Sequence, residues 1–223
     1  MRIPLALAVE ALPRLNALPR WCGDKDSTGV HEMAEFQDYS RRPTTRDQTR
    51  IENVLLGRDL TGLDILHVGV GNSGLAAKFH SKCRTVDGIT LGANELALAQ
   101  SLGIANYRCR LLNKYDPRLA RKLGTRYDLV IDNNPTTYCC CRWHATAMMT
   151  NYSRLLKPGG TIFTDERGLG WFSEPNDPRW GLTPDEWWVL GQHFGLGSVK
   201  FTDHVIGLVM PLPGAMESKD RVA

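Results

Sequence analysis

The sequence predicts an α/β protein whose core is a mostly parallel β-sheet. From residue 63 onward, short apolar stretches alternate with stretches of helical periodicity, a pattern that is typical of βαβ units. The stretch RYDLVIDNN at 126–134 is an apolar run that ends in polar residues, as expected of a strand with both faces buried. A glycine-rich turn, HVGVGNSGLA at 67–76, lies between the first apolar stretch and a helical segment.

The elements follow in order along the chain. Ahead of the sheet, TRDQTRIENVLLGRDL at 45–60 predicts a helix that ends at Gly57. Thr183, Pro184 and Glu186 occupy the N-cap, first-turn and capping-box positions of a late helix. The last stretch, 198–211, contains two extended pieces that are expected to pair antiparallel. Strands are expected at 63–68, 85–89, 106–112, 126–134 and 161–165, helices at 75–81, 93–103 and up to 156, and a turn at 157–160.

Composition limits the classes of function. The 223 residues are 42% hydrophobic and 23% charged, which suits one globular domain with an extension. The net charge of +3 and the pI near 8.5 lie below the pI of about 9 that marks nucleic-acid binding, so no nucleic-acid partner is expected. The apolar N-terminal run is interrupted by Glu10 and is too short to span a membrane, so no membrane partner is expected. Six cysteines without C-x-x-C spacing predict reduced thiols in a cytoplasmic protein and no metal site.

The glycine turn gains meaning from a second motif about 85 residues later. RLLKPGGTIFTDE at 154–166 resembles the LKPGG segment of class I S-adenosylmethionine-dependent methyltransferases, and HVGVGNSGLA resembles their first motif. GITLGANELALAQ at 88–100 and YDLVIDNN at 127–134 extend the match, which covers about residues 60–212. The resemblance implies a Rossmann-like, seven-stranded, mostly parallel sheet with a C-terminal antiparallel strand pair and helices on both faces. It also implies an N-terminal helical extension or lid at 1–60 and an S-adenosylmethionine-binding methyltransferase domain at 61–213. The last residues, 214–223, are expected to form a disordered tail.

The resemblance implies a site for S-adenosylmethionine. Thr90 stands where the family usually has the acid that holds the ribose hydroxyls, and Asp87, three residues earlier, is the alternative. Leu91 is expected to pack on the adenosine, and Asn113 or Leu112 to meet the adenine amino group. The full set of expected donor contacts is Tyr39, Gly69, Gly71, Ser73, Gly74, Thr90, Leu91, Asn113, Asp132 and Asn133.

Two residues are candidates for acid–base chemistry. Asp132 follows the fourth strand, where the family's strand points at the sulfonium, and His144 lies shortly beyond it. Methyl transfer is an in-line displacement at an activated carbon, so a base is optional. His67 is expected at a strand end with a backbone partner, and the run from Cys139 to Cys141 is expected to be buried and inert.

The acceptor is expected to be a small molecule methylated on oxygen or nitrogen. Arg41, Arg42, Arg46 and Arg50 suit an acidic acceptor, whereas Trp171, Phe172 and Trp180 suit a planar or sugar-like one. Monomer and homodimer both remain open. One alternative is an NAD(P)-dependent oxidoreductase, because Asp87 lies 18 residues beyond Gly69. The other is a non-catalytic domain that retains the fold, because position 90 lacks the acid.

Overall fold

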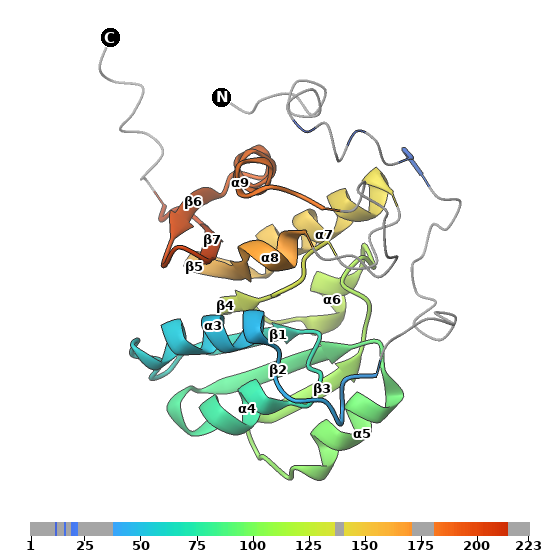
Figure 1. Cartoon of the computed structure of the whole chain (residues 1–223), viewed down its shortest axis with the longest axis vertical. Helices are drawn as coiled ribbons and strands as arrows, with labels where there is room; N and C mark the ends of the chain where they lie inside the picture. The colour runs from blue at the N-terminus through green and yellow to red at the C-terminus, as the bar shows by residue number, and fades with distance from the viewer. Residues whose placement is uncertain are drawn as a thin grey trace.

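The chain folds around one mixed β-sheet with helices on both faces (Figure 1). In this computed structural model the described residues are Leu12, Asn16, 19–21, 38–136, 141–170 and 181–213. Within them the sheet has seven strands in the order β3-β2-β1-β4-β5-β7-β6. Strands β1 to β5 are parallel, and β7 is antiparallel to both β5 and β6. The bounds are β1 Asp64–Val68, β2 Thr85–Thr90, β3 Tyr107–Leu111, β4 Tyr127–Ile131, β5 Leu156–Asp165, β6 Gly197–Lys200 and β7 Val205–Val209. The predicted sheet is confirmed.

Two apolar clusters hold the helices against opposite faces of the sheet. One joins the sheet to α3, α4 and α5 and includes Ile51, Leu75 and Phe79. The other joins it to α6, α7, α8 and α9 and includes Met149 and Trp187. The helices are α3 Arg46–Leu56, α4 Gly74–Phe79, α5 Ala93–Ser101, α6 Leu119–Leu123, α7 Arg142–Leu155, α8 Glu166–Leu169 and α9 Pro184–His193, with a 3-10 turn η1 at His80–Lys82. No helix among the described residues combines the length and the apolar character needed to cross a bilayer.

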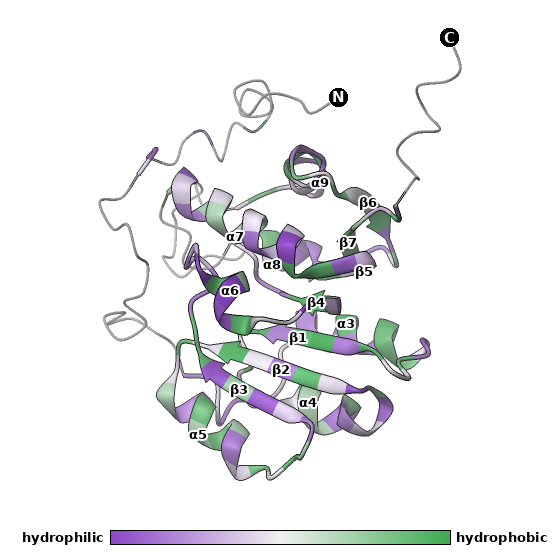
Figure 2. Cartoon of the chain, turned by 180° about the vertical axis from the view of Figure 1, so that it is seen from behind, coloured by the Kyte–Doolittle hydropathy of each residue, from purple (hydrophilic) through white to green (hydrophobic). Residues whose placement is uncertain are grey.

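The strand order follows from how much apolar surface each strand offers. Strand β3 carries alternating arginines and forms an edge, and Figure 2 shows it more polar than its neighbour β2. Near the other edge β7, VIGLV, is buried along most of its length, whereas β6, GSVK, alternates between half-buried and exposed positions. The more apolar strand therefore lies beside β5, and the later half of the predicted antiparallel pair is the inner one.

The expected turn at 157–160 lies inside β5. Tyr127 pairs with Leu156 and Leu129 pairs with Thr161, so the extra residues form an irregularity within the strand. Gly159 has a left-handed φ of +77°. A Cβ at Gly160 would lie 2.8 Å from the Lys157 carbonyl oxygen, so this backbone admits only glycine there. The prediction of a turn before the strand was wrong, because the two glycines let the strand bulge rather than end.

Some of the described N-terminal residues contact the rest of the fold. Leu12 is 1% exposed and lies in the cluster with α7 and α9. The carbonyl oxygens of Pro19 and Arg20 accept hydrogen bonds from the backbone N–H groups of Arg142 and Trp143, at 3.0 and 3.2 Å. These contacts satisfy two donors at the start of α7. The three-part division of the chain stays a prediction, since most of 1–37 and all of 214–223 lie outside the described residues.

Candidate active site

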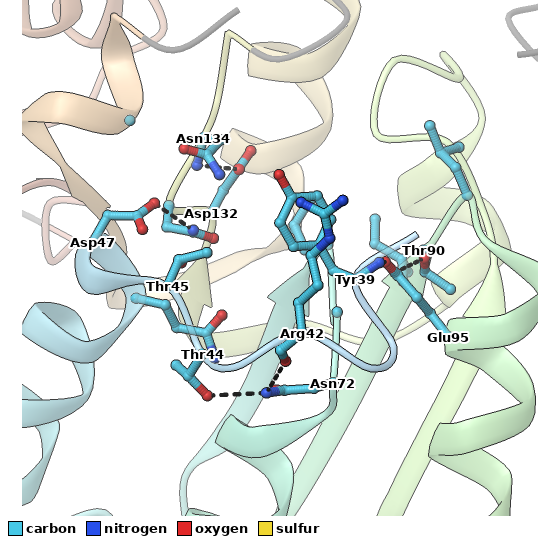
Figure 3. A pocket seen from close by; sticks show the side chains of 18 of the residues that line it. Tyr39, Arg42, Thr44, Thr45, Asp47, Asn72, Thr90, Glu95, Asp132 and Asn134 are labelled. Carbon is cyan, nitrogen blue, oxygen red and sulfur yellow. Dashed lines mark hydrogen bonds between the residues drawn. The ribbon is translucent and has the colours of Figure 1, made fainter. Parts of the chain in front are cut away.

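A cavity of about 310 Å³ opens at the carboxyl ends of β1 to β4. Val68, Thr90 and Asp132 line it where β1, β2 and β4 end, and residues 42–48 cover it from the start of α3. Strand β1 lies between β2 and β4, so the cavity lies where the strand order reverses. Ligands of open α/β sheets bind at such points. Figure 3 shows Thr90 and Glu95 on one side, Asp47, Asp132 and Asn134 on the other, and Tyr39 with Arg42 between them.

The glycine turn forms one wall of the cavity. Gly69 and Gly71 both line it, with left-handed φ values of +75° and +50°. The N–H of Gly69 donates to the Ile89 carbonyl at 2.9 Å, which fixes the turn against β2. A Cβ on Gly69 would meet no atom within 4 Å, whereas one on Gly71 would lie 3.4 Å from the Cβ of Tyr39. The turn therefore leaves room for a ligand at Gly69 and for Tyr39 at Gly71.

Two residues predicted to line the cavity lie elsewhere. The left-handed φ of Ser73, +57°, accompanies a buried hydroxyl that lies 3.0 Å from the Tyr107 hydroxyl. Gly74 admits the close approach of the covering segment, because a Cβ there would lie 2.8 Å from Thr44 Oγ1. Neither residue is among those that line the cavity.

Asn72 lines the cavity instead and ties the glycine turn to the segment above it. Its amide nitrogen donates to the Arg42 carbonyl at 2.9 Å and to Thr44 Oγ1 at 3.2 Å. Its amide oxygen accepts from the Gly74 N–H at 2.9 Å. The Asn72 side chain thus joins the start of α4 to residues 42–44 (Figure 3).

Glu95, which the sequence reasoning missed, supplies the carboxylate absent from position 90. Its oxygens accept from the Thr90 hydroxyl at 2.5 Å and from the Tyr39 N–H at 3.0 Å. Thr90 Oγ1 in turn accepts from the Gly92 N–H at 3.0 Å. Burial raises the pKa of Glu95 above its ordinary value, and the hydrogen bonds from Thr90 and Tyr39 oppose that rise. The available signal was an acid in the first turn of the helix that follows Thr90.

Asp87, the alternative ribose contact, is hydrogen-bonded to residues of β3 and β4. Its carboxylate accepts from Arg108 Nε at 2.9 Å and from the Tyr127 hydroxyl at 2.7 Å. It is 1% exposed and lies outside the cavity lining. These contacts occupy the group that a nicotinamide dinucleotide would need for its ribose.

The predicted adenine side is mostly apolar. Leu91, Leu112 and Ile89 line it together with Asn113. The Asn113 side-chain oxygen accepts from the Tyr115 N–H at 3.0 Å, which holds the turn after β3 in place. A carbonyl oxygen has two lone pairs, so Asn113 keeps one acceptor position.

Asp132 lies at the centre of a hydrogen-bonded cluster at the end of β4. Lys114 Nζ donates to both carboxylate oxygens, at 3.3 and 3.0 Å, and to the Asn134 carbonyl at 2.7 Å. The Tyr152 hydroxyl donates to Asp132 at 2.6 Å, and the Asn134 N–H donates at 3.2 Å. The carboxylate thus accepts four hydrogen bonds while it is 2% exposed. Burial and the adjacent carboxylate raise the pKa of Tyr152, so this hydroxyl stays a donor.

Asn133 connects the end of β4 to the helices above it. Its side-chain nitrogen donates to Asp47 at 2.8 Å, and both residues line the cavity. Gly168 in α8 packs directly on its backbone, since a Cβ there would lie 1.5 Å from the Asn133 carbonyl oxygen. The loop after β4 is therefore held between α3 and α8.

His144 lies outside the cavity lining. It is 2% exposed, and its Nδ1 lies 3.4 Å from the sulfur of Cys141, which is buried as expected. Its ring centroid is 6.3 Å from that of Tyr115, and Tyr115 itself lines the cavity. The histidine thus supports a wall residue, and the geometry gives it no contact with the cavity. Cys139, Cys140, Trp171, Phe172 and Trp180 lie outside the described residues.

His67 also differs from its prediction. It lies within β1, opposite Gly88 and Ile131, and is fully buried. Neither ring nitrogen has a hydrogen-bond partner in the described part of the chain, so the expected backbone partner is absent there. Burial lowers the pKa of His67 to about 4, so the ring is neutral near pH 7.

Comparison with solved structures identifies the fold. The N-methyltransferase NodS from Bradyrhizobium japonicum WM9 is 11% identical, with a TM-score of 0.58 over 73% of this chain and 93% of that one. CalS10, a SAM-bound amino pentose methyltransferase from Micromonospora echinaspora, is 16% identical, with a TM-score of 0.56 over 80% and 99%. An O-methyltransferase family protein from Burkholderia thailandensis is 16% identical, with a TM-score of 0.56 over 75% and 56%.

The chain therefore has the class I methyltransferase fold, as its two motifs predicted. These three structures are described as N-, amino pentose and O-methyltransferases, so the likeness does not distinguish among acceptors. No protein-family model matches the sequence, and no curated protein is significantly similar to it.

Proposed function

We propose that this chain is an S-adenosylmethionine-dependent methyltransferase that methylates an oxygen or nitrogen atom of a small molecule. The observation that carries the proposal is the pairing of two features across one cavity. Gly69 leaves open space at the end of β1, and the Glu95 carboxylate lies buried beyond the end of β2. A backbone that admits close approach and a carboxylate that accepts from vicinal hydroxyls are the parts a ribose-bearing donor requires.

The residues around the cavity fit the donor's chemical parts. Glu95 and Thr90 would hold the ribose hydroxyls, and Leu91, Leu112 and Asn113 would receive the base. Tyr39, which is half-buried with its N–H on Glu95, would cover the nucleoside. When bound, the donor supplies a methyl group that is activated for displacement by a positively charged sulfur.

The chain's own contribution is alignment and exclusion of water. Residues 42–48 cover the cavity, and Asn72 fastens part of this segment to the glycine turn. Asp132 acts as a positioning residue in this proposal. Its four accepted hydrogen bonds use the lone pairs that a general base would need for the acceptor's proton. The methylated atom is then expected to attack with a free lone pair, without first giving a proton to Asp132.

The oxidoreductase alternative lacks its ribose contact, because Asp87 is bound by Arg108 and Tyr127. The alternative of a non-catalytic domain rested on the missing acid at position 90. Glu95 supplies a carboxylate at that place, which favours a working donor site.

Calorimetry with S-adenosylmethionine, S-adenosylhomocysteine and NAD⁺ tests the proposal, with Gly69→Ala as the informative variant. Gly69 and Gly103 both have left-handed φ, +75° and +61°, and a Cβ on either meets no atom within 4 Å. Both alanine variants should lose a similar ~1–2 kcal/mol of stability from backbone strain. Only Gly69 lines the cavity, so only Gly69→Ala should weaken binding of the sulfur nucleosides.

Two results would overturn the proposal. One is the absence of binding by either sulfur nucleoside to the wild-type protein. The other is equal affinity of Gly69→Ala and Gly103→Ala for S-adenosylhomocysteine, because that result would remove the glycine turn from the site.

A further inference from the structure

The cavity wall opposite Glu95 carries positive charge from two helices. Arg46 and Arg50 come from the first two turns of α3, and Arg167 comes from α8. Arg46 and Arg50 are four residues apart, so their side chains lie on the same face of α3. Asp165 joins the two helices. Its carboxylate accepts hydrogen bonds from Nε and a terminal nitrogen of Arg50, both at 2.6 Å. It also caps α8 by accepting a hydrogen bond from the Arg167 N–H at 3.0 Å.

Two of these three arginines form no ion pair with a described residue. The Arg50–Asp165 pair is bidentate and its carboxylate is fully buried, so Arg50 is neutralised within the fold. Arg46 and Arg167 are exposed and line the cavity, and their guanidinium groups make no hydrogen bond or ion pair with any described residue. Arg46 lies four residues before Arg50 in α3, and Arg167 lies two residues after Asp165 in α8.

The nearby acids are already engaged. Asp47 accepts from the Asn133 amide at 2.8 Å, and Glu166 lies 2.5 Å from His204 Nδ1. The remaining carboxylates of the cavity lining, Glu95 and Asp132, hold Thr90 and Lys114 respectively. The two guanidinium groups are therefore available to a ligand. Guanidinium groups bind carboxylate and phosphate oxygens through paired N–H donors.

We infer that the acceptor carries an oxyanion, a carboxylate or a phosphate, which Arg46 and Arg167 bind while the methylated atom faces the donor. This inference rests on the proposed function, which assigns the opposite wall of the cavity, with Glu95, to the nucleoside. The carboxylate of the donor's amino-acid part is the other group that these arginines could bind. The experiment below distinguishes it from an oxyanion of the acceptor.

The test is a titration of the full chain, saturated with S-adenosylhomocysteine, with benzoate, phenyl phosphate and the uncharged isostere benzamide. At least one anion should bind about tenfold or more tightly than benzamide, since one charge-assisted hydrogen bond gives that ratio or more. The preferred anion identifies carboxylate or phosphate as the natural group. Arg46→Gln/Arg167→Gln should abolish the preference, whereas Arg121→Gln/Arg126→Gln should keep it. Arg121 and Arg126 are exposed arginines outside the cavity lining.

Affinity for two nucleosides identifies which carboxylate the arginines hold. The Arg46→Gln/Arg167→Gln variant should bind S-adenosylhomocysteine and 5′-methylthioadenosine as the wild type does. A variant that loses affinity only for S-adenosylhomocysteine would overturn the inference, because 5′-methylthioadenosine lacks the amino-acid carboxylate. Equal binding of anions and benzamide, undetectable binding of both anions, or a preference that survives in the variant would also overturn it. Failure of S-adenosylhomocysteine to bind would instead overturn the proposed function, and the same titration without it decides whether the arginines select anions.

Discussion

Glu95 gives the sharpest test of the proposed donor site. A carboxylate offers about four lone-pair positions. In this structure the Thr90 hydroxyl and the Tyr39 N–H occupy two of them, and the backbone of Gly71 also interacts with this carboxylate. At least one position therefore remains for a ribose hydroxyl. Each hydrogen bond to a charged group contributes roughly 1.5–3 kcal/mol.

Glu95→Gln should therefore weaken S-adenosylhomocysteine binding by about 2–3 kcal/mol, because the charge and at least one acceptor position are lost. This free energy corresponds to a roughly 30- to 150-fold increase in Kd, measured by calorimetry. Glu52→Gln is the matched control. Glu52 is equally buried and accepts hydrogen bonds from Gln48 and Lys78, but it lies outside the cavity lining. Its replacement should change stability and leave the nucleoside Kd unchanged.

A thermodynamic cycle identifies the hydroxyl contact itself. Removing the 2′-hydroxyl from S-adenosylhomocysteine should weaken binding to the wild type and have little further effect on Glu95→Gln, with a coupling of about 1.5 kcal/mol. The pH dependence gives a second readout, because burial raises the pKa of Glu95. As pH falls through that raised pKa, the carboxylate gains a proton and the wild type should lose affinity, whereas Glu95→Gln should not. Independent, additive losses in the cycle would refute the assignment of Glu95 to the ribose.

Three further variants test contacts within the fold, each by chemical unfolding. Lys114→Met should lower the free energy of unfolding by about 3 kcal/mol, because it leaves the buried Asp132 carboxylate without its cation. Adding Asp132→Asn should recover much of this loss. No recovery would contradict the pairing of Lys114 with Asp132. Gly168→Ala should lower the free energy of unfolding by about 2 kcal/mol or more, because the new Cβ would overlap the Asn133 carbonyl and displace the loop after β4. A variant as stable as the wild type would contradict this packing of α8 on the loop. Thr183→Ala should cost about 1 kcal/mol through loss of the capping box of α9, without any change in nucleoside affinity.

The fold was largely predictable because its signals are local. The capping box at Thr183 and Glu186 is present as predicted, and so is the stop of α3 at Gly57. The bulge in β5 could not be read from the sequence, because the same Pro-Gly-Gly letters are compatible with a turn or with an irregular strand. The contact with the neighbouring strand Tyr127–Ile131 decides between them.

The lining of the cavity was predictable where backbone conformation places a residue there. Gly69 and Gly71 line the cavity because their left-handed φ values are demanded by the turn that follows β1. Ser73 was wrongly expected there, because the orientation of a side chain in a left-handed turn depends on a distant partner, Tyr107. Glu95 was missed because the position of its carboxylate also depends on tertiary packing. The carboxylate reaches the cavity through the packing of α5 against the sheet.

The short contact between residues 19–20 and the start of α7 has a consequence for how the protein can be prepared. Helix α7 carries Tyr152, and Tyr152 donates to the Asp132 carboxylate, which lines the cavity. Trimming the chain past Arg20 would remove both carbonyl caps from this helix and empty the core position of Leu12, which contributes about 2 kcal/mol when buried. Shortening the amino terminus past this point would thus disturb the hydrogen bond between Tyr152 and Asp132 from the opposite end of a fourteen-residue helix.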